Sequence, residues 1–200
     1  MKIKSICILL IIFLTSSTSF NANAQNNRLD RIEDGILLDL AKSRTRPQTE
    51  VLMFLSKNYQ YIDYSIPVGM FVGGAIGQNK ELRQNAAYVA SSTLISYGLS
   101  AIIKKLVKRD RPFIRNVSIT PVYEPTRYSF PSGHTALSIS TATALSISYP
   151  KWYVIAPSFL WAGATSYSRM YLGVHYPTDV AGGAVLGAGT AASLIFLKKP

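Results

Sequence analysis

The two histidines of this 200-residue chain both stand in short polar blocks that could do acid–base and nucleophilic chemistry. His175 precedes Asp179 by four residues, and Pro177 between them suits the first turn of a helix. A carboxylate in that turn could hold one imidazole nitrogen protonated and leave the other free to attack an electrophile. An alternative role for Asp179 is to offset the positive end of the helix dipole, and the two roles can coexist.

The other histidine, His134, ends the sequence Pro-Ser-Gly-His at residues 131–134, which opens an apolar segment. A helix that starts here presents free N–H groups and the positive end of its dipole, and both suit a phosphate oxygen. Gly133 would let the backbone approach a ligand closely, and Ser132 could add a hydroxyl donor. Ser132 could instead be an ordinary helix cap, but the adjacent histidine favours a functional role.

A third block is strongly basic. Lys104, Lys108 and Arg111 are spaced so that they would share one face of a helix, which Pro112 is expected to end. We predict that Lys104 and Arg111 bind phosphate, because arginine offers two parallel donors and lysine a compact charge. The other basic side chains of the block are predicted to reach lipid headgroups instead: Lys105, Lys108 and Arg109.

Taken in chain order, from the basic block to His175 and Asp179, the blocks resemble the three-part signature of the type-2 phosphatidic acid phosphatase superfamily, whose site is shared by vanadium haloperoxidases. The resemblance spans about residues 104–179 and holds at each fixed position of the signature. The matching elements are Lys104 with six residues before Arg111-Pro112, then Pro131-Ser132-Gly133-His134, then Ser168-Arg169 with five residues before His175 and three more before Asp179.

The resemblance implies a phosphatase with a covalent intermediate. His175 would attack phosphorus to form a phosphohistidine, while His134 would donate a proton to the leaving oxygen and then activate water. Asp179 would orient His175. No metal or other cofactor is implied, since fixed cationic side chains take the place of a metal. The phosphate-binding residues that the family suggests are Lys104, Arg111, Ser132, Gly133 and Arg169.

Residues 1–24 are typical of a secretory signal peptide, with two early lysines, an apolar run over 6–14 and a small-x-small site at 22–24. Cleavage after Ala24 is expected; an uncleaved anchor is the alternative, and either places Gln25 outside the cytoplasm. The only cysteine, Cys7, lies in this leader, which excludes disulfides and thiol chemistry from the mature chain.

The remaining chain predicts an all-α fold. Residues 25–58 are expected to form amphipathic helices, the second over 50–57, that either cap the core or lie on a membrane surface. Residues 59–200 are expected to form a membrane-embedded bundle of about five transmembrane helices. These are nearly uncharged segments rich in small residues, at roughly 61–78, 85–103, 133–149, 152–168 and 178–197. Core helices of a soluble protein are the alternative.

The net charge of +11 indicates an anionic partner, and export favours lipid phosphate over nucleic acid. The turns that are expected on the cytoplasmic side carry basic residues, which agrees with the positive-inside preference. The outer face, which carries the three blocks, has a further excess of basic residues. We therefore expect an enzyme of the bacterial inner membrane whose site faces the periplasm.

The expected substrate is a lipid phosphate in the bilayer: lipid A phosphate, undecaprenyl diphosphate, phosphatidate or phosphatidylglycerophosphate, with a slight preference for lipid A. A soluble periplasmic acid phosphatase and a haloperoxidase are the alternatives.

Overall fold

The computed structural model describes residues 26–125 and 128–198, so the predicted leader lies outside the described residues. The chain divides into two compact units, residues 1–32 and 33–200, and the helical bundle belongs to the second.

The described residues form α-helices, one short 3-10 helix and no regular strand, which confirms the all-α prediction. The helices are α2 (Asn26–Lys42), α3 (Arg46–Ile76), α4 (Lys80–Val107), α5 (Pro112–Arg115), α6 (Gly133–Ser148), α7 (Trp152–Tyr171) and α8 (Pro177–Ser193), followed by the 3-10 helix η1 (Ile195–Leu197).

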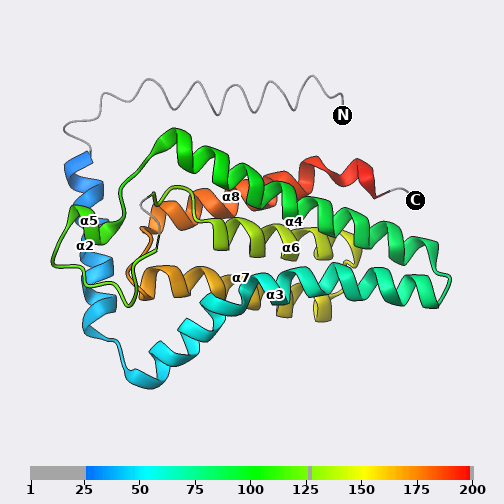
Figure 1. The fold of residues 1–200 in the computed structure, drawn as a ribbon, viewed down its shortest axis with the longest axis horizontal. Coiled ribbons are helices and arrows are strands. Elements are labelled where there is room, and N and C mark those ends of the chain that lie inside the picture. Colours follow the sequence, from blue (N-terminus) through cyan, green and yellow to red (C-terminus); the bar gives the residue numbers. More distant parts are fainter. Residues whose placement is uncertain (1–25, 126–127, 199–200) are drawn as a thin grey trace. The chain divides into compact units, whose positions relative to one another are not determined.

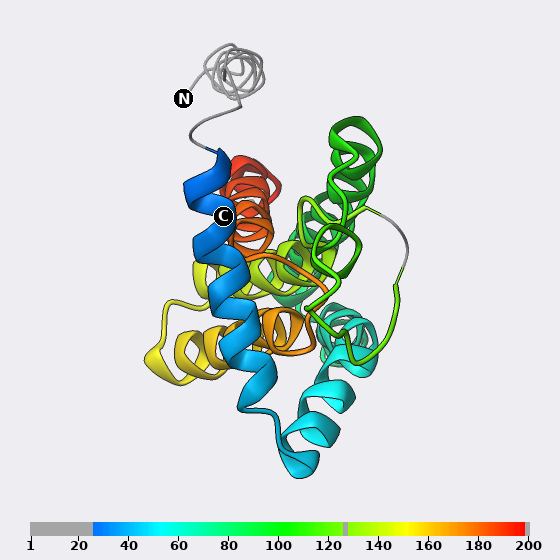
Figure 2. The same ribbon diagram turned by 90° about the vertical axis from the view of Figure 1, so that its left-hand side faces the viewer.

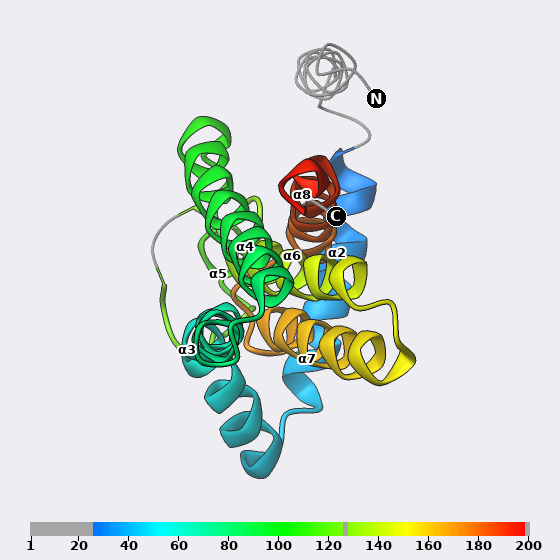
Figure 3. The ribbon, with the colours of Figure 1, turned by 90° about the vertical axis from the view of Figure 1, so that its right-hand side faces the viewer.

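Five long helices, α3, α4, α6, α7 and α8, run lengthwise beside one another (Figure 1). The end-on view shows them as neighbouring coils, with α6 among the other four (Figure 3). Helix α6 packs against each of the other four. The five apolar segments predicted from the sequence each correspond to one of these helices.

Side-chain caps and prolines set the helix starts. The side chain of Thr45 accepts from the Gln48 amide at the start of α3, and Asn79 caps α4 by accepting from the Leu82 amide at 2.9 Å. Pro177 occupies the first turn of α8, as expected. The prediction of a separate helix over 50–57 is wrong, because α3 continues unbroken from Arg46 to Ile76.

The interior of the bundle is unusually rich in small polar side chains. The Thr93 and Thr141 hydroxyls lie 2.9 Å apart between α4 and α6, and Ser96 donates to the Ala136 carbonyl at 3.0 Å across the same interface. Large apolar side chains are instead exposed along the outer faces of the helices, including Val68, Phe71, Leu94, Ile102, Leu160 and Val185. Small polar residues inside and large apolar residues outside are typical of helices that pack within lipid.

Glycines bring α8 against α6. A Cβ atom on Gly183 would lie 2.6 Å from the Ser132 carbonyl oxygen, and one on Gly187 would meet the Ala136 carbonyl oxygen. The two glycines are four residues apart and therefore share one face of α8. The backbones can approach this closely only without side chains there, which fixes the start of α6 against α8.

Two described segments are long and apolar enough to cross a bilayer, namely Lys80–Val107, which is α4, and Pro177–Leu197, which joins α8 to η1. The number of about five transmembrane helices stays a prediction.

Candidate active site

The polar blocks gather at one end of the bundle, where the segments after α4 and α7 lie (Figure 2). The route by which the basic block reaches this end differs from the prediction. Helix α4 ends at Val107, Lys108 adopts a left-handed conformation with φ 53°, and Arg111 precedes the short helix α5. Lys104, Lys108 and Arg111 therefore do not share a helix face, and Pro112 begins a helix instead of ending one.

His175 is held from both sides of its ring. Its Nδ1 atom lies 3.3 Å from Oδ2 of Asp179, and its Nε2 atom lies 3.3 Å from Nη1 of Arg111. Because a guanidinium has only donors, Nε2 must offer its lone pair and Nδ1 must carry the proton toward the carboxylate. The ring is 2% exposed. The contact between His175 and Asp179 that the sequence predicts is therefore present in the structure.

The surroundings of His175 favour its neutral form. Burial, reinforced by the charges of Arg111 and Arg169, holds the pKa of His175 well below its ordinary 6.5. Burial and the charge of Arg169 also lower the pKa of Arg111, to about 10, so this guanidinium stays charged at neutral pH. The second hydrogen bond from Arg111 Nη1, 2.6 Å to the Val174 carbonyl, fixes its place beside the imidazole.

His134, in the first turn of α6, is fixed by α3. Its ring stacks on that of Tyr59 with the centroids 3.7 Å apart and the planes 21° from parallel. Its Nε2 atom lies 3.1 Å from the Ser56 carbonyl oxygen, to which it must donate. Tyr59 and Ser56 are separated by three residues and so present one face of α3 to the histidine.

Arg169, in the last turn of α7, reaches the same region and is 1% exposed. It donates to the hydroxyl of Ser56 and, at 2.7 Å, to the hydroxyl of Tyr123. Its Nε group is buried and has no hydrogen-bond partner among the described residues. A buried cationic donor of this kind suits an anionic ligand.

Ser132 and Gly133 open α6 as the sequence predicts. The Ser132 hydroxyl accepts from the Thr135 amide at 3.4 Å and the Thr135 hydroxyl at 3.0 Å, so Ser132 is a helix cap in this structure. Its backbone amide donates to the Asp179 carbonyl at 2.9 Å, which connects the block at 131–134 to the first turn of α8.

Lys104 anchors the segment that leads into α6. Its ammonium group donates to the carbonyls of Tyr128 at 3.3 Å, Ser129 at 2.9 Å and Pro131 at 2.9 Å. These bonds use all three of its N–H groups. Phosphate binding by Lys104 stays a prediction, and it requires exchange of one carbonyl for a phosphate oxygen.

Sequence reasoning misplaced Arg109 and missed Glu33. Arg109, expected to reach lipid headgroups, instead donates to Oδ1 of Asp179 at 2.8 Å and to Glu33 at 2.6 Å. Glu33, in α2, carries no motif that could have marked it, since Arg109 is 76 residues away in the chain.

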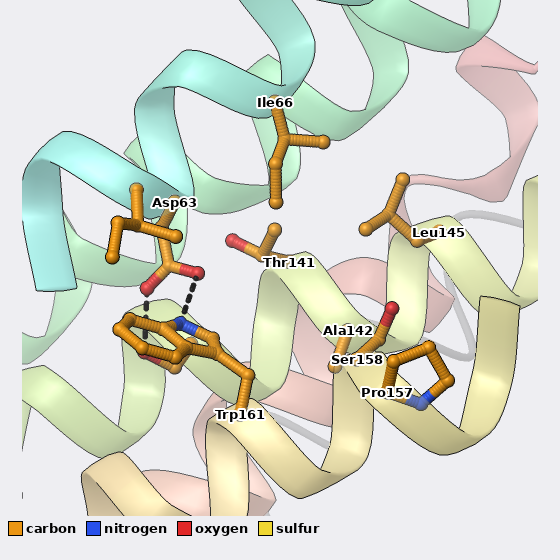
Figure 4. A pocket seen from close by; sticks show the side chains of 10 residues that line it. Asp63, Ile66, Thr141, Ala142, Leu145, Pro157, Ser158 and Trp161 are labelled. Carbon is orange, nitrogen blue, oxygen red and sulfur yellow. Dashed lines mark hydrogen bonds between the residues drawn. The ribbon is translucent and has the colours of Figure 1, made fainter. Parts of the chain in front are cut away.

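A further buried carboxylate, Asp63 of α3, points toward Trp161 of α7 (Figure 4). It accepts from Ser138 at 2.5 Å and from the indole of Trp161 at 3.1 Å, beside a cavity of about 270 Å³ lined by α3, α6 and α7. Ser138 follows His134 by one helical turn, so Asp63 links the three helices directly beneath that histidine.

Comparison with known proteins shows similarity to lipid phosphatases. The chain is 35% identical over 113 residues to an undecaprenyl-diphosphatase of Sulfolobus acidocaldarius, a match that covers 54% of this chain and 53% of that protein. It is 42% identical over 60 residues to a lipid A 4'-phosphatase of Bacteroides thetaiotaomicron, covering 30% of this chain and 27% of the relative. The chain thus matches about half the length of the first relative and less of the second.

The fold is shared with a transmembrane PAP2-type phosphatidylglycerolphosphate phosphatase from Bacillus subtilis, with a TM-score of 0.69 and 21% identity. The superposition covers 95% of this chain and 92% of that one. A family model described as the PAP2 superfamily matches residues 85–199, which include all three polar blocks. The resemblance seen in the motifs is therefore confirmed, and the chain belongs to the PAP2 superfamily.

Proposed function

We propose that the chain is a membrane-embedded lipid phosphatase that works without a metal and forms a phosphohistidine at His175. The observation that carries this proposal is the placement of His175 between Asp179 and Arg111, each 3.3 Å from one ring nitrogen. This arrangement directs the Nε2 lone pair toward a cationic group, where an anionic phosphoryl group would bind.

The first step transfers the phosphoryl group to the protein. The lone pair of His175 Nε2 attacks phosphorus, the bond from phosphorus to the leaving oxygen breaks, and His134 donates a proton to that oxygen. Arg111 turns its Nη1 donor from Nε2 to a phosphate oxygen as the N–P bond forms. Asp179 accepts from Nδ1 throughout and stabilises the positive charge that develops on the ring.

The second step releases phosphate. His134, now neutral, removes a proton from water while the water oxygen attacks phosphorus and the N–P bond breaks. The electron pair of that bond returns to His175 Nε2. The products are the dephosphorylated lipid alcohol and inorganic phosphate, or a monophosphate and inorganic phosphate from a diphosphate.

Five groups would bind the equatorial oxygens: the side chains of Lys104, Arg111, Arg169 and Ser132, and the amide of Gly133. The Nε group of Arg169, which has no hydrogen-bond partner in the described part of the chain, is one donor that could fill this role. Three fixed cations here could offset the charge that a metal ion offsets in other phosphatases.

The site is proposed to face the periplasm from the inner membrane, with about five helices crossing the bilayer. Apolar outer faces and a hydroxyl-rich interior support embedding in lipid. A cysteine introduced at Val117 should react with an impermeant reagent from the periplasm, whereas one at Gln78 should be protected. The reverse pattern would place the site on the cytoplasmic side.

The substrate class is a lipid that carries a phosphate or diphosphate headgroup. The names of the relatives point to a polyprenyl diphosphate or lipid A, and we retain a slight preference for lipid A.

The deciding experiment assays the purified full chain in detergent against lipid A, undecaprenyl diphosphate, phosphatidate and phosphatidylglycerophosphate, with and without EDTA. We expect release of phosphate from at least one lipid, unchanged by EDTA and lowered at least ~10³-fold in His175→Ala and in His134→Ala. Activity that requires added magnesium, or that survives His175→Ala, would exclude this mechanism.

A further inference from the structure

Helix α2 contributes a buried carboxylate to the surroundings of the active site. Glu33 is 1% exposed, and its Oε1 atom accepts from the Thr178 amide at 2.9 Å and the Thr178 hydroxyl at 2.6 Å. Its Oε2 atom pairs with Nη2 of Arg109 at 2.6 Å. The Glu33 carboxylate therefore binds the first turn of α8, which also carries Asp179.

Arg109 extends this contact to the catalytic pair. Its Nη1 atom donates to Oδ1 of Asp179 at 2.8 Å and to the Thr178 hydroxyl at 2.6 Å. The same carboxylate of Asp179 faces Nδ1 of His175 through Oδ2. A continuous path of charged hydrogen bonds thus runs from Glu33 through Arg109 and Asp179 to His175.

A second acidic residue of α2 makes a parallel contact. Asp34 accepts from Arg115 at 2.8 Å and from the Asn116 amide group at 3.0 Å. The guanidinium carbons of Arg109 and Arg115 lie 4.0 Å and 4.5 Å from the ring centroid of Tyr176, the residue after His175. Adjacent acids in α2 therefore hold two arginines against the segment that carries His175.

We propose that Glu33 is a positioning residue of the phosphatase site, acting through Arg109 on Asp179 and so on His175. This inference depends on the proposed function, since it concerns the same histidine. The family match begins at residue 85, so this contribution of α2 comes from outside the matched region.

The physical reason is that Arg109 divides its two terminal nitrogens between two carboxylates. Without the charge of Glu33, the guanidinium can move wholly onto Asp179 and draw that carboxylate away from His175 Nδ1. The imidazole would then lose its orientation, and small displacements of a reacting group cost up to about 100-fold in rate. A buried arginine left with one acid instead of two would also strengthen the positive field at His175.

The test compares Glu33→Gln with Asp39→Asn in the full chain. Glutamine keeps the size of Glu33 and can still accept from Thr178, but it cannot neutralise Arg109. Asp39 lies on the same helix, its side chain is 79% exposed, and it pairs only with Lys42 among the interactions described, so Asp39→Asn controls for loss of an acid from α2.

We expect Glu33→Gln to lower kcat about 10- to 100-fold and to change KM less than about threefold, because the phosphate-binding groups are untouched. The acid limb of the kcat–pH profile should move to lower pH, since a negative charge has been removed near His175. The charged groups that face His175 are Arg111, Arg169, Lys104, Arg109 and Asp179, and all are retained in this variant. Asp39→Asn should match the wild type in kcat, KM and pH profile.

Arg109→Lys provides an independent check, since lysine keeps the charge but cannot span both carboxylates. We expect a loss of kcat similar to that of Glu33→Gln. The double variant Glu33→Gln/Arg109→Lys should be no slower than Arg109→Lys alone, because both substitutions interrupt the same series of hydrogen bonds.

Equal kcat in Glu33→Gln and Asp39→Asn would overturn the positioning role. A rate loss that only follows the fraction unfolded, measured by thermal melting, would overturn it too. A wild-type chain inactive on all four lipids would instead reject the proposed function, so the two failures are distinguishable.

Discussion

Arg111 places Nη1 3.3 Å from Nε2 of His175 and 2.6 Å from the Val174 carbonyl oxygen, beside the place where the proposed function has a phosphoryl group meet the histidine. A guanidinium can keep the Val174 contact through one N–H while another N–H binds a phosphate oxygen. A lysine has one nitrogen and cannot hold the same two groups with the same geometry.

Arg111→Lys should therefore lower kcat/KM by about 100-fold while the protein stays folded. Vanadate inhibition should weaken by a similar factor, because vanadate mimics the five-coordinate phosphorus that Arg111 would contact. The control is Lys105→Arg, an exchange of the same two residue types at the end of α4 and outside the proposed site. An Arg111→Lys enzyme with wild-type kcat/KM would exclude Arg111 from the phosphate site.

The ring of Tyr59 should matter for catalysis because it fixes the plane of His134 by stacking at 3.7 Å. Tyr59→Leu removes the aromatic face and should lower kcat roughly 10-fold, a part of the 10²- to 10⁴-fold that a general acid supplies. Tyr59→Phe keeps the ring and is the matched control, expected to remain within about threefold of the wild type. Equal rates in the leucine and phenylalanine variants would show that stacking does not orient His134.

Close packing of α8 on α6 predicts a strong effect of one methyl group. Gly183→Ala would place Cβ 2.6 Å from the Ser132 carbonyl oxygen and should destabilise the fold by about 1–3 kcal/mol, as overpacked sites do. It should also lower activity, since Ser132 precedes Gly133 and His134. Gly189→Ala is the control on the same helix, because among the described residues its new Cβ would meet no atom of another element within 4 Å. Thermal melting in detergent of the two variants should separate them, and identical midpoints would contradict this packing.

The sequence could identify the parts of the site that are close in the chain. His175 and Asp179 are four residues apart, and Ser132, Gly133 and His134 are consecutive, so spacing alone predicts their proximity. The five long helices were also predictable, because each contains a nearly uncharged segment of sufficient length.

The contacts that were missed depend on tertiary structure. Glu33 lies on a surface-like amphipathic helix, and only the folded chain shows that its carboxylate is buried against Arg109 and Thr178. Helices commonly end at a glycine in the left-handed conformation, but here Lys108 adopts that conformation. The sequence therefore contains no sign that the helix ends within the basic block. Tyr59 and Ser56 were not predicted because their partner, His134, belongs to another helix.

In the proposed mechanism the two histidines need opposite protonation states, and this determines the expected pH dependence of kcat. His175 must be neutral to attack, and its pKa is held well below 6.5 by burial and by Arg111 and Arg169. The neutral fraction of His175 therefore rises through a pH range below 6.5 and is complete near neutrality. In the proposed mechanism His134 must be protonated to donate, and the negative charge of the bound phosphate favours that form, so activity should fall again at higher pH as His134 loses its proton in the complex. Arg111, with a pKa of about 10, stays charged over this range.

We expect a bell-shaped kcat–pH profile with its maximum roughly between pH 5 and 8. Asp179→Asn should cut kcat by ~10²- to 10⁴-fold with little change in KM, because an amide cannot hold the Nδ1 proton of His175 in the same tautomer. Its acid limb should also move to lower pH, since the negative charge that favours protonated His175 is gone. Asp39→Asn again serves as the exposed control. A flat profile in the wild type, or an Asp179→Asn enzyme as fast as the wild type, would show that His175 and Asp179 do not work as a pair.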